Sequence, residues 1–263
     1  MEHACHALKR WIVLYLEVED DSDKWMCSPL VWMSIFVRKM PINWDKDNTS
    51  HKYVKKLVEI FREQFQKLIK EKTKRGGLIW ISCELLRAYF LLAQVNQCSF
   101  LISAIKTSYQ KEGGFIPEND ELPKSVSVTF YYFWGKHCVF DHNFKEAEEK
   151  LSWAFDNCHS EAVDNQRRIL SYLVPVKLRY GILPKPDLLK QYNLGEFDQL
   201  VQAILEGNMR LYSEKLEEHA DHFIQQGTYL LMERHKMLVY RNLCKRVFRL
   251  QSTGGNNSCR ERR

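Results

Sequence analysis

The sequence is poor in residues that break helices. Glycine occupies only 11 of its 263 positions and proline only 7. A β-sandwich needs a turn about every ten residues, so this scarcity of turn formers favours long helices instead. Hydrophobic residues make up 45% of the chain and charged residues 27%. This balance excludes a largely disordered chain and supplies enough apolar surface for a sizeable core.

Long apolar runs are also lacking. The longest uncharged apolar stretch, residues 25–37, is too short to span a bilayer and contains Pro29. A shorter run at residues 11–16 ends in an acidic stretch, unlike a secretory signal. The eight cysteines are scattered and no two are spaced as CxxC. We interpret them as reduced thiols that act mostly as small buried hydrophobes, which predicts a protein of the cytosol or nucleus.

Apolar side chains recur at three- and four-residue intervals and predict a succession of helices. Residues 111–123, which hold two glycines and two prolines, are expected to form a loop. Taken alone, residues 126–130 are compatible with a strand, but their helical neighbours favour a helix. We expect helices over residues 25–40, 52–73, 78–95, 98–109, 125–140, 165–180, 194–205, 208–223 and 228–250. The helix at 165–180 is expected to break at Pro175, and Pro186 is expected to open a further short helix.

The most informative local pattern lies in residues 130–155. Gly135, which would allow a neighbouring helix to approach closely, is preceded by two large aromatic residues. An aromatic residue, two alanines and a leucine follow it. These offsets match the tetratricopeptide pattern, in which two antiparallel helices pack closely. An ordinary helical hairpin would give the same architecture. The residues that set the stacking are Tyr131, Trp134, Gly135, Phe144, Ala147, Leu151 and Ala154.

These patterns predict an all-α fold, a TPR-like α-solenoid in which each helix pair buries its apolar face against the next. We expect an atypical N-terminal segment at 1–23, helical repeats at 24–123 and a second helical part at 124–250. Residues 251–263 contain no large apolar side chain and are expected to form a disordered tail.

Signatures of catalysis are missing. The sequence contains no phosphate-binding loop, dinucleotide-binding fingerprint or nucleophile elbow. A hydrolase or metalloenzyme would have to use one of several small His and Cys clusters, none of which has an evident third ligand. We therefore expect no catalytic residue, no metal site and no cofactor.

Positive charge is concentrated in two segments. Residues 52–75 carry nine basic side chains against three acidic ones, and residues 234–263 carry nine against one. The net charge of the whole chain is only +6, so the remainder is acidic overall. In the second segment the basic residues recur along one predicted helix and form a candidate phosphate-binding stripe. The alternative is a solvated face that keeps the protein soluble. The stripe consists of Arg241, Lys245, Arg246 and Arg249.

Four blocks carry a family resemblance. They are residues 147–155 (AEEKLSWAF), 169–177 (ILSYLVPVK), 188–194 (LLKQYNL) and 240–248 (YRNLCKRVF). In order and spacing they resemble the PCI-domain subunit of the second transcription-export (TREX) complex, which is related to the twelfth-subunit-like family of the COP9 signalosome. The resemblance covers roughly residues 24–249.

The resemblance implies a role as well as a fold. PCI proteins have stacked helices followed by a C-terminal winged helix, and the family has no catalytic residues to carry over. It implies a scaffold subunit that couples transcription to mRNA export in the nucleus, at the nuclear pore, and is also found in the cytoplasm. The implied partners are a large export scaffold protein, a small acidic disordered protein of the proteasome-lid type, and an RNA or DNA backbone, with no membrane. The alternative is a PCI scaffold in a signalosome, proteasome-lid or initiation-factor-like assembly.

The sequence departs from this family after Arg249. A winged helix should follow, yet only the polar residues 251–263 remain. We therefore expect a chain that stops before the winged helix, with apolar surface exposed at its open end. Such a chain should be poorly soluble unless a partner or a dimer covers that surface.

Overall fold

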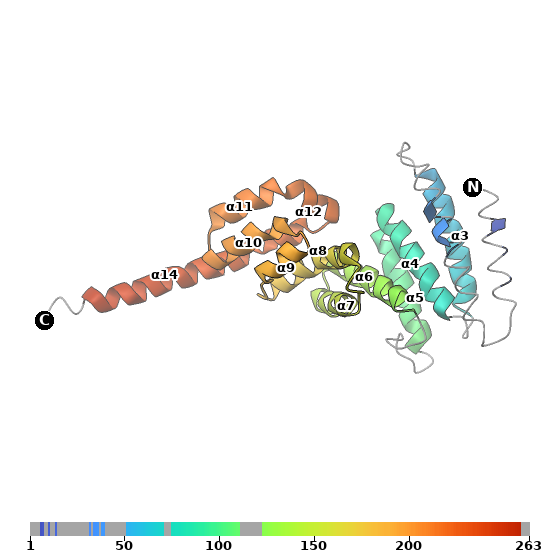
Figure 1. Cartoon of the computed structure of the whole chain (residues 1–263), viewed down its shortest axis with the longest axis horizontal. Coiled ribbons are helices and arrows are strands. Elements are labelled where there is room, and N and C mark those ends of the chain that lie inside the picture. The colour runs from blue at the N-terminus through green and yellow to red at the C-terminus, as the bar shows by residue number, and fades with distance from the viewer. Residues whose placement is uncertain are drawn as a thin grey trace. The chain divides into compact units, whose positions relative to one another are not determined.

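The computed structural model describes residues 51–70, 75–110 and 123–258, together with positions 6, 7, 10, 14, 32, 34–36, 38 and 39. Every regular element in these ranges is a helix (Figure 1), which confirms the all-α fold class. The stretch 126–130 is helical as well. None of the helices described is long and apolar enough to cross a membrane. Most of the helix expected at 25–40, the loop at 111–122 and residues 259–263 lie outside the described residues.

The chain divides into two compact units, Met1–His137 and Cys138–Arg263. The boundary therefore falls inside a helix. The division at residue 124 expected from the sequence stays a prediction. The helices of the first unit are α3 (Lys52–Leu68), α4 (Arg75–Leu91), α5 (Val95–Gln110) and most of α6 (Lys124–Phe140).

Consecutive helices pack on one another in the first unit. The apolar face predicted for α3 is buried and lies against α4, which in turn contacts α5. The Sγ of Cys83 in α4 lies 3.9 Å from the carbonyl oxygen of Val126 in α6, and Ser99 Oγ of α5 lies 3.2 Å from His137 Nε2 of α6. The glycine pair 76–77, expected to separate two helices, instead lies in the first turn of α4.

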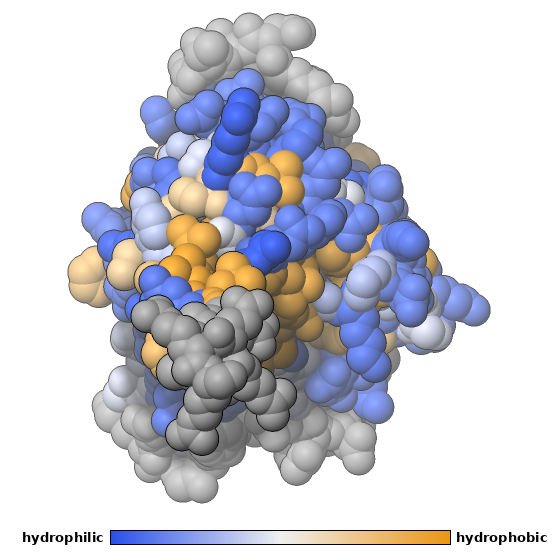
Figure 2. All heavy atoms as spheres, turned by 90° about the vertical axis from the view of Figure 1, so that its left-hand side faces the viewer, coloured by the Kyte–Doolittle hydropathy of each residue, from blue (hydrophilic) through white to orange (hydrophobic). Residues whose placement is uncertain are grey.

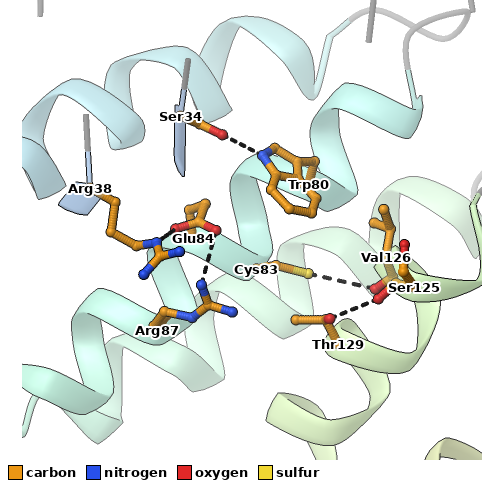
Figure 3. A network of polar contacts seen from close by, with 9 residues as sticks. All are labelled: Ser34, Arg38, Trp80, Cys83, Glu84, Arg87, Ser125, Val126 and Thr129. Carbon is orange, nitrogen blue, oxygen red and sulfur yellow. Dashed lines mark hydrogen bonds and ion pairs between the residues drawn. The ribbon is translucent and has the colours of Figure 1, made fainter. Parts of the chain in front are cut away.

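A buried ion-pair network crosses the first unit (Figure 3). The carboxylate of Glu84 is fully buried in α4, 2.6 Å from Arg38 Nε and 3.3 Å from Arg87 Nη1. Trp80, one turn earlier, donates its indole N–H to Ser34. Burial raises the pKa of the Glu84 carboxyl, and the two guanidinium groups partly offset this rise. The network ties the helical positions 34–36 and 38 to α4.

The second unit continues the same pattern. After the end of α6 it contains α7 (Phe144–Asp156), α8 (Val163–Arg179), α9 (Pro186–Gln191), α10 (Gly195–Glu206), α11 (Met209–Glu218), α12 (Ala220–Gln226), α13 (Tyr229–Arg234) and α14 (Lys236–Ser258). α7 pairs with α8, α10 with α11, and α12 with α13, while α14 returns to pack on α10 and α11. Asparagine side chains cap two of these helices, Asn143 at α7 and Asn208 at α11. Most of these helices thus bury apolar side chains on their sequence neighbours, whereas α14 packs mainly on α10 and α11.

In the second unit, the helix boundaries differ from the expected ones at four places. α8 is not broken at Pro175 but runs through it, since burial of the side chains around this residue offsets the lost backbone hydrogen bond. The helices expected at 208–223 and 228–250 are each interrupted, at His219 and His235. Neither interruption has a glycine or proline to mark it. α14 continues past Leu250 to Ser258, into the segment expected to be disordered.

His235, at the junction of α13 and α14, makes the second unit sensitive to acid. Its side chain is buried, and neither ring nitrogen has a hydrogen-bond partner. Burial and the nearby charge of Arg179 lower the pKa of His235 to about 4. A histidine whose pKa is lower in the folded state binds more protons when unfolded, so stability falls as pH falls.

We expect the second unit to lose about 2 kcal/mol of unfolding free energy between pH 7 and pH 5 through this one group. His235→Leu should remove this loss, so that the unfolding free energy changes less between pH 7 and pH 5. Urea unfolding at several pH values measures it. Equal acid sensitivity in the native chain and in His235→Leu would show that other groups are responsible.

Candidate nucleic-acid interface

The seven residues of the tetratricopeptide-like pattern are all buried. In the first unit, the rings of Tyr131 and Trp134 stack with their centroids 5.8 Å apart. In the second unit, Ala147, Leu151 and Ala154 form a fully buried face of α7, the helix that pairs with α8. These residues therefore build the core. The close approach of a neighbouring helix at Gly135 stays a prediction.

α14, which carries the predicted stripe, is anchored at Gly207. This glycine ends α10 in the left-handed conformation, at φ +67°. A Cβ atom built on it would lie 2.6 Å from the backbone nitrogen and 2.8 Å from the Cα of Leu243. Only glycine accommodates both this φ value and this approach. The backbone of α14 thus crosses the end of α10 in direct contact.

Two side chains of α14 reinforce this crossing. Asn242 Nδ2 donates to the carbonyl oxygen of Ile204 at 2.7 Å, and Arg246 Nη1 donates to that of Glu206 at 3.2 Å. Carbonyl groups in the last turn of a helix have no partner within that helix, so both bonds satisfy the end of α10. Arg246, predicted as a nucleic-acid contact, is therefore partly engaged in holding α14 in place.

The other three residues of the stripe share one face of α14. Arg241, Lys245 and Arg249 are four residues apart, which keeps them within about 80° around a helix of 3.6 residues per turn. All three are exposed. No acidic residue occurs anywhere in α14 (Lys236–Ser258), so no carboxylate on this helix offsets their charge. We call these three residues the α14 basic face; it has the composition of a phosphate-binding surface.

The side of α14 opposite the basic face is apolar and exposed. Tyr240, Val247 and Leu250 have exposed fractions of 49%, 45% and 65%. Figure 2 looks toward the end of the molecule where α14 terminates, and shows apolar side chains gathered among hydrophilic ones. α14 is therefore amphipathic beyond the point where it crosses α10.

The second basic segment differs from α14. In α3 the basic side chains alternate with the acidic Glu59 and Glu63, and no basic face free of acidic residues forms. α3 is also occupied on its apolar side by α4. The stretch 71–74, which carries two further lysines, lies outside the described residues.

The histidine clusters assemble no metal site where the structure describes them. His222 Nε2 lies 3.4 Å from Glu196 Oε1 and 2.7 Å from Gln226 Nε2. Across the described positions, no group of three or more His, Cys, Asp or Glu side chains is arranged to hold a metal ion.

The fold and the surface define a class: an all-α helical-repeat protein with a long, basic, exposed final helix. No family model matches the chain. The chain is, however, 36% identical over 228 residues to enhanced ethylene response protein 5 of Arabidopsis thaliana, an alignment covering 85% of this chain and 54% of the relative. It is 39% identical over 183 residues to PCI domain-containing protein 2 of Xenopus laevis, an alignment covering 70% of this chain and 44% of the relative.

A third relative is the protein CSN12 homolog of Neurospora crassa, 33% identical over 181 residues, covering 68% of this chain and 39% of the relative. Homologues of the chain are thus PCI domain-containing 2 proteins, which supports the resemblance found in the four sequence blocks. The chain spans about half the length of the curated relatives it matches.

Proposed function

We propose that this chain is a non-catalytic PCI-type scaffold subunit that couples transcription to mRNA export. The homologues named PCI domain-containing protein 2 and the stacked-helix fold support this assignment. In this role it works in the nucleus, at the nuclear pore, and is also present in the cytoplasm. Its proposed protein partners are a large export scaffold protein and a small acidic disordered protein of the proteasome-lid type.

Within that role, we propose that the α14 basic face contributes an accessory contact to an RNA or DNA backbone. The observation that carries this proposal is the alignment of Arg241, Lys245 and Arg249 on an exposed helix that contains no acidic residue. Contacts to phosphates release bound counterions, so binding of this kind does not depend on sequence and weakens steeply with salt.

The test is the salt dependence of binding to a fluorescent single-stranded RNA, followed by anisotropy. The triple variant Arg241→Gln, Lys245→Gln and Arg249→Gln should reduce the slope of log K against log salt by about 2, because three phosphate contacts are lost. Arg246 is left in place because it holds the end of α10.

A matched triple variant on α3 controls for overall charge. Lys52→Gln, Lys55→Gln and Lys67→Gln removes the same charge from exposed positions elsewhere, and should leave the slope nearly unchanged. Equal effects of the two triple variants would mean that net charge, and not the α14 basic face, attracts RNA.

A second candidate assembly is a signalosome, with the proteasome lid and initiation-factor-like complexes as related possibilities. The observation that favours it is the similarity to the relative named CSN12 homolog. Affinity purification of the tagged chain followed by mass spectrometry separates the assemblies. Recovery of signalosome subunits without mRNA-export factors would overturn the first assignment and support the second.

A further inference from the structure

Three serines of this chain lie three residues after an arginine, the spacing that arginine-directed protein kinases select. They are Ser171 after Arg168, Ser213 after Arg210, and Ser252 after Arg249. Sequence alone makes the three equivalent. The structure separates them by burial and by the stability of the surrounding helix.

Ser171 and Ser213 are poor kinase substrates in the folded chain. Ser171 is buried in α8, and its hydroxyl donates to the carbonyl oxygen of Arg168 at 2.9 Å. Ser213 is only partly exposed, in the middle of α11, between the buried residues Tyr212 and Leu216. A kinase binds its substrate in extended form, and extending either segment would unpack the core of the second unit.

Ser252 differs in both respects. It is exposed, and its hydroxyl makes only a local bond to the carbonyl oxygen of Phe248, one turn earlier in α14. After Thr253 come Gly254 and Gly255, and glycine is among the least favourable residues inside a helix. The end of α14 therefore unwinds at low cost without disturbing the core.

Ser252 also lies on the α14 basic face. It is three residues after Arg249 and seven after Lys245, the spacing that places residues on one side of a helix. From these observations we infer that Ser252 is the acceptor site of an arginine-directed protein kinase, and that its phosphorylation weakens phosphate binding by the α14 basic face. The regulatory part rests on the proposed function of that face.

The chemistry requires ATP and the kinase as co-reactants. The Ser252 Oγ forms a bond to the γ-phosphorus of ATP while the bond from that phosphorus to the bridging oxygen breaks. ADP leaves, and the hydroxyl proton passes to a carboxylate of the kinase. The product carries a charge of about −2 at neutral pH beside Arg249, so it offsets most of the positive charge of the face. A phosphate near a helix C-terminus also opposes the helix dipole and favours unwinding of the last turns.

The first test is phosphorylation of the full folded chain by an arginine-directed kinase of the calmodulin-dependent class with Mg²⁺ and ATP. Sites are mapped by mass spectrometry. Ser252 should be modified, and Ser171 and Ser213 should not, although synthetic peptides carrying each of the three motifs should all be substrates. Ser252→Ala should remove the signal, and Arg249→Gln should reduce the rate at least tenfold. Modification of Ser213 or Ser171 in preference to Ser252 would overturn the inference.

The second test compares RNA binding before and after phosphorylation. The phosphorylated chain should bind single-stranded RNA about tenfold more weakly at low salt, and phosphatase treatment should restore the affinity. Phosphorylation of Ser252 with unchanged affinity would overturn the regulatory role. If the unmodified chain fails to bind RNA, the proposed function of the face fails, and the kinase assay still decides whether Ser252 is an acceptor.

Discussion

Gly207→Ala is expected to lower the unfolding free energy of the second unit by about 3 kcal/mol and to release α14 from α10. Two terms add up to this value. A residue with a Cβ costs about 1 kcal/mol in the left-handed conformation that Gly207 adopts. The new Cβ would also lie within 3 Å of the backbone of Leu243, and overpacking against an unyielding backbone costs about 2 kcal/mol more.

Gly181→Ala is the matched control. Gly181 has a similar φ of +77°, but nothing lies within 4 Å of a Cβ built there. Its substitution should cost only the conformational term, about 1 kcal/mol. Urea unfolding and hydrogen exchange of the α14 amides measure both variants. If the two substitutions destabilise the chain equally, the close crossing of α14 over α10 is not present in solution.

Glu84→Ala should destabilise the first unit by about 3 kcal/mol, because removing one partner of a buried ion pair leaves the other charges uncompensated. The side chains of Arg38 and Arg87 remain 19% and 31% exposed, so water relieves part of the cost. Glu84→Gln, which keeps the volume and removes the charge, should cost less.

The control for Glu84 is an exposed carboxylate on the neighbouring helix. Glu59 in α3 is exposed, and Glu59→Ala should change stability by no more than about 0.5 kcal/mol. Thermal unfolding followed by circular dichroism compares the variants. A loss in Glu84→Ala no greater than in Glu59→Ala would mean that the network of Figure 3 does not stabilise the chain.

The sequence predicted the fold class because the signals for it are local. Apolar periodicity placed α3, α5 and α10 close to their observed positions, and Pro186 marked the start of α9. The breaks at His219 and His235 were missed since neither residue disfavours helix by itself. The break predicted at Pro175 was wrong, because packing between segments distant in sequence offsets the missing backbone hydrogen bond.

The candidate interface was predictable only in part. The spacing of Arg241, Lys245 and Arg249 on one face follows from helical geometry alone. That Arg246 bonds the end of α10, and that Gly207 admits the backbone of α14, depend on which helices meet. A glycine after a helix is a common C-terminal signal, and nothing in the sequence around Gly207 identifies a second helix lying against it.

Ultraviolet cross-linking of the chain to single-stranded RNA, with the cross-linked peptides identified by mass spectrometry, would locate the RNA contact on the chain. Cross-links should be concentrated in peptides from residues 240–252; the triple variant of the α14 basic face should abolish them and the α3 triple variant should leave them intact. Cross-links confined to residues 52–75, or spread evenly over the basic residues of the chain, would contradict an RNA contact at the α14 basic face.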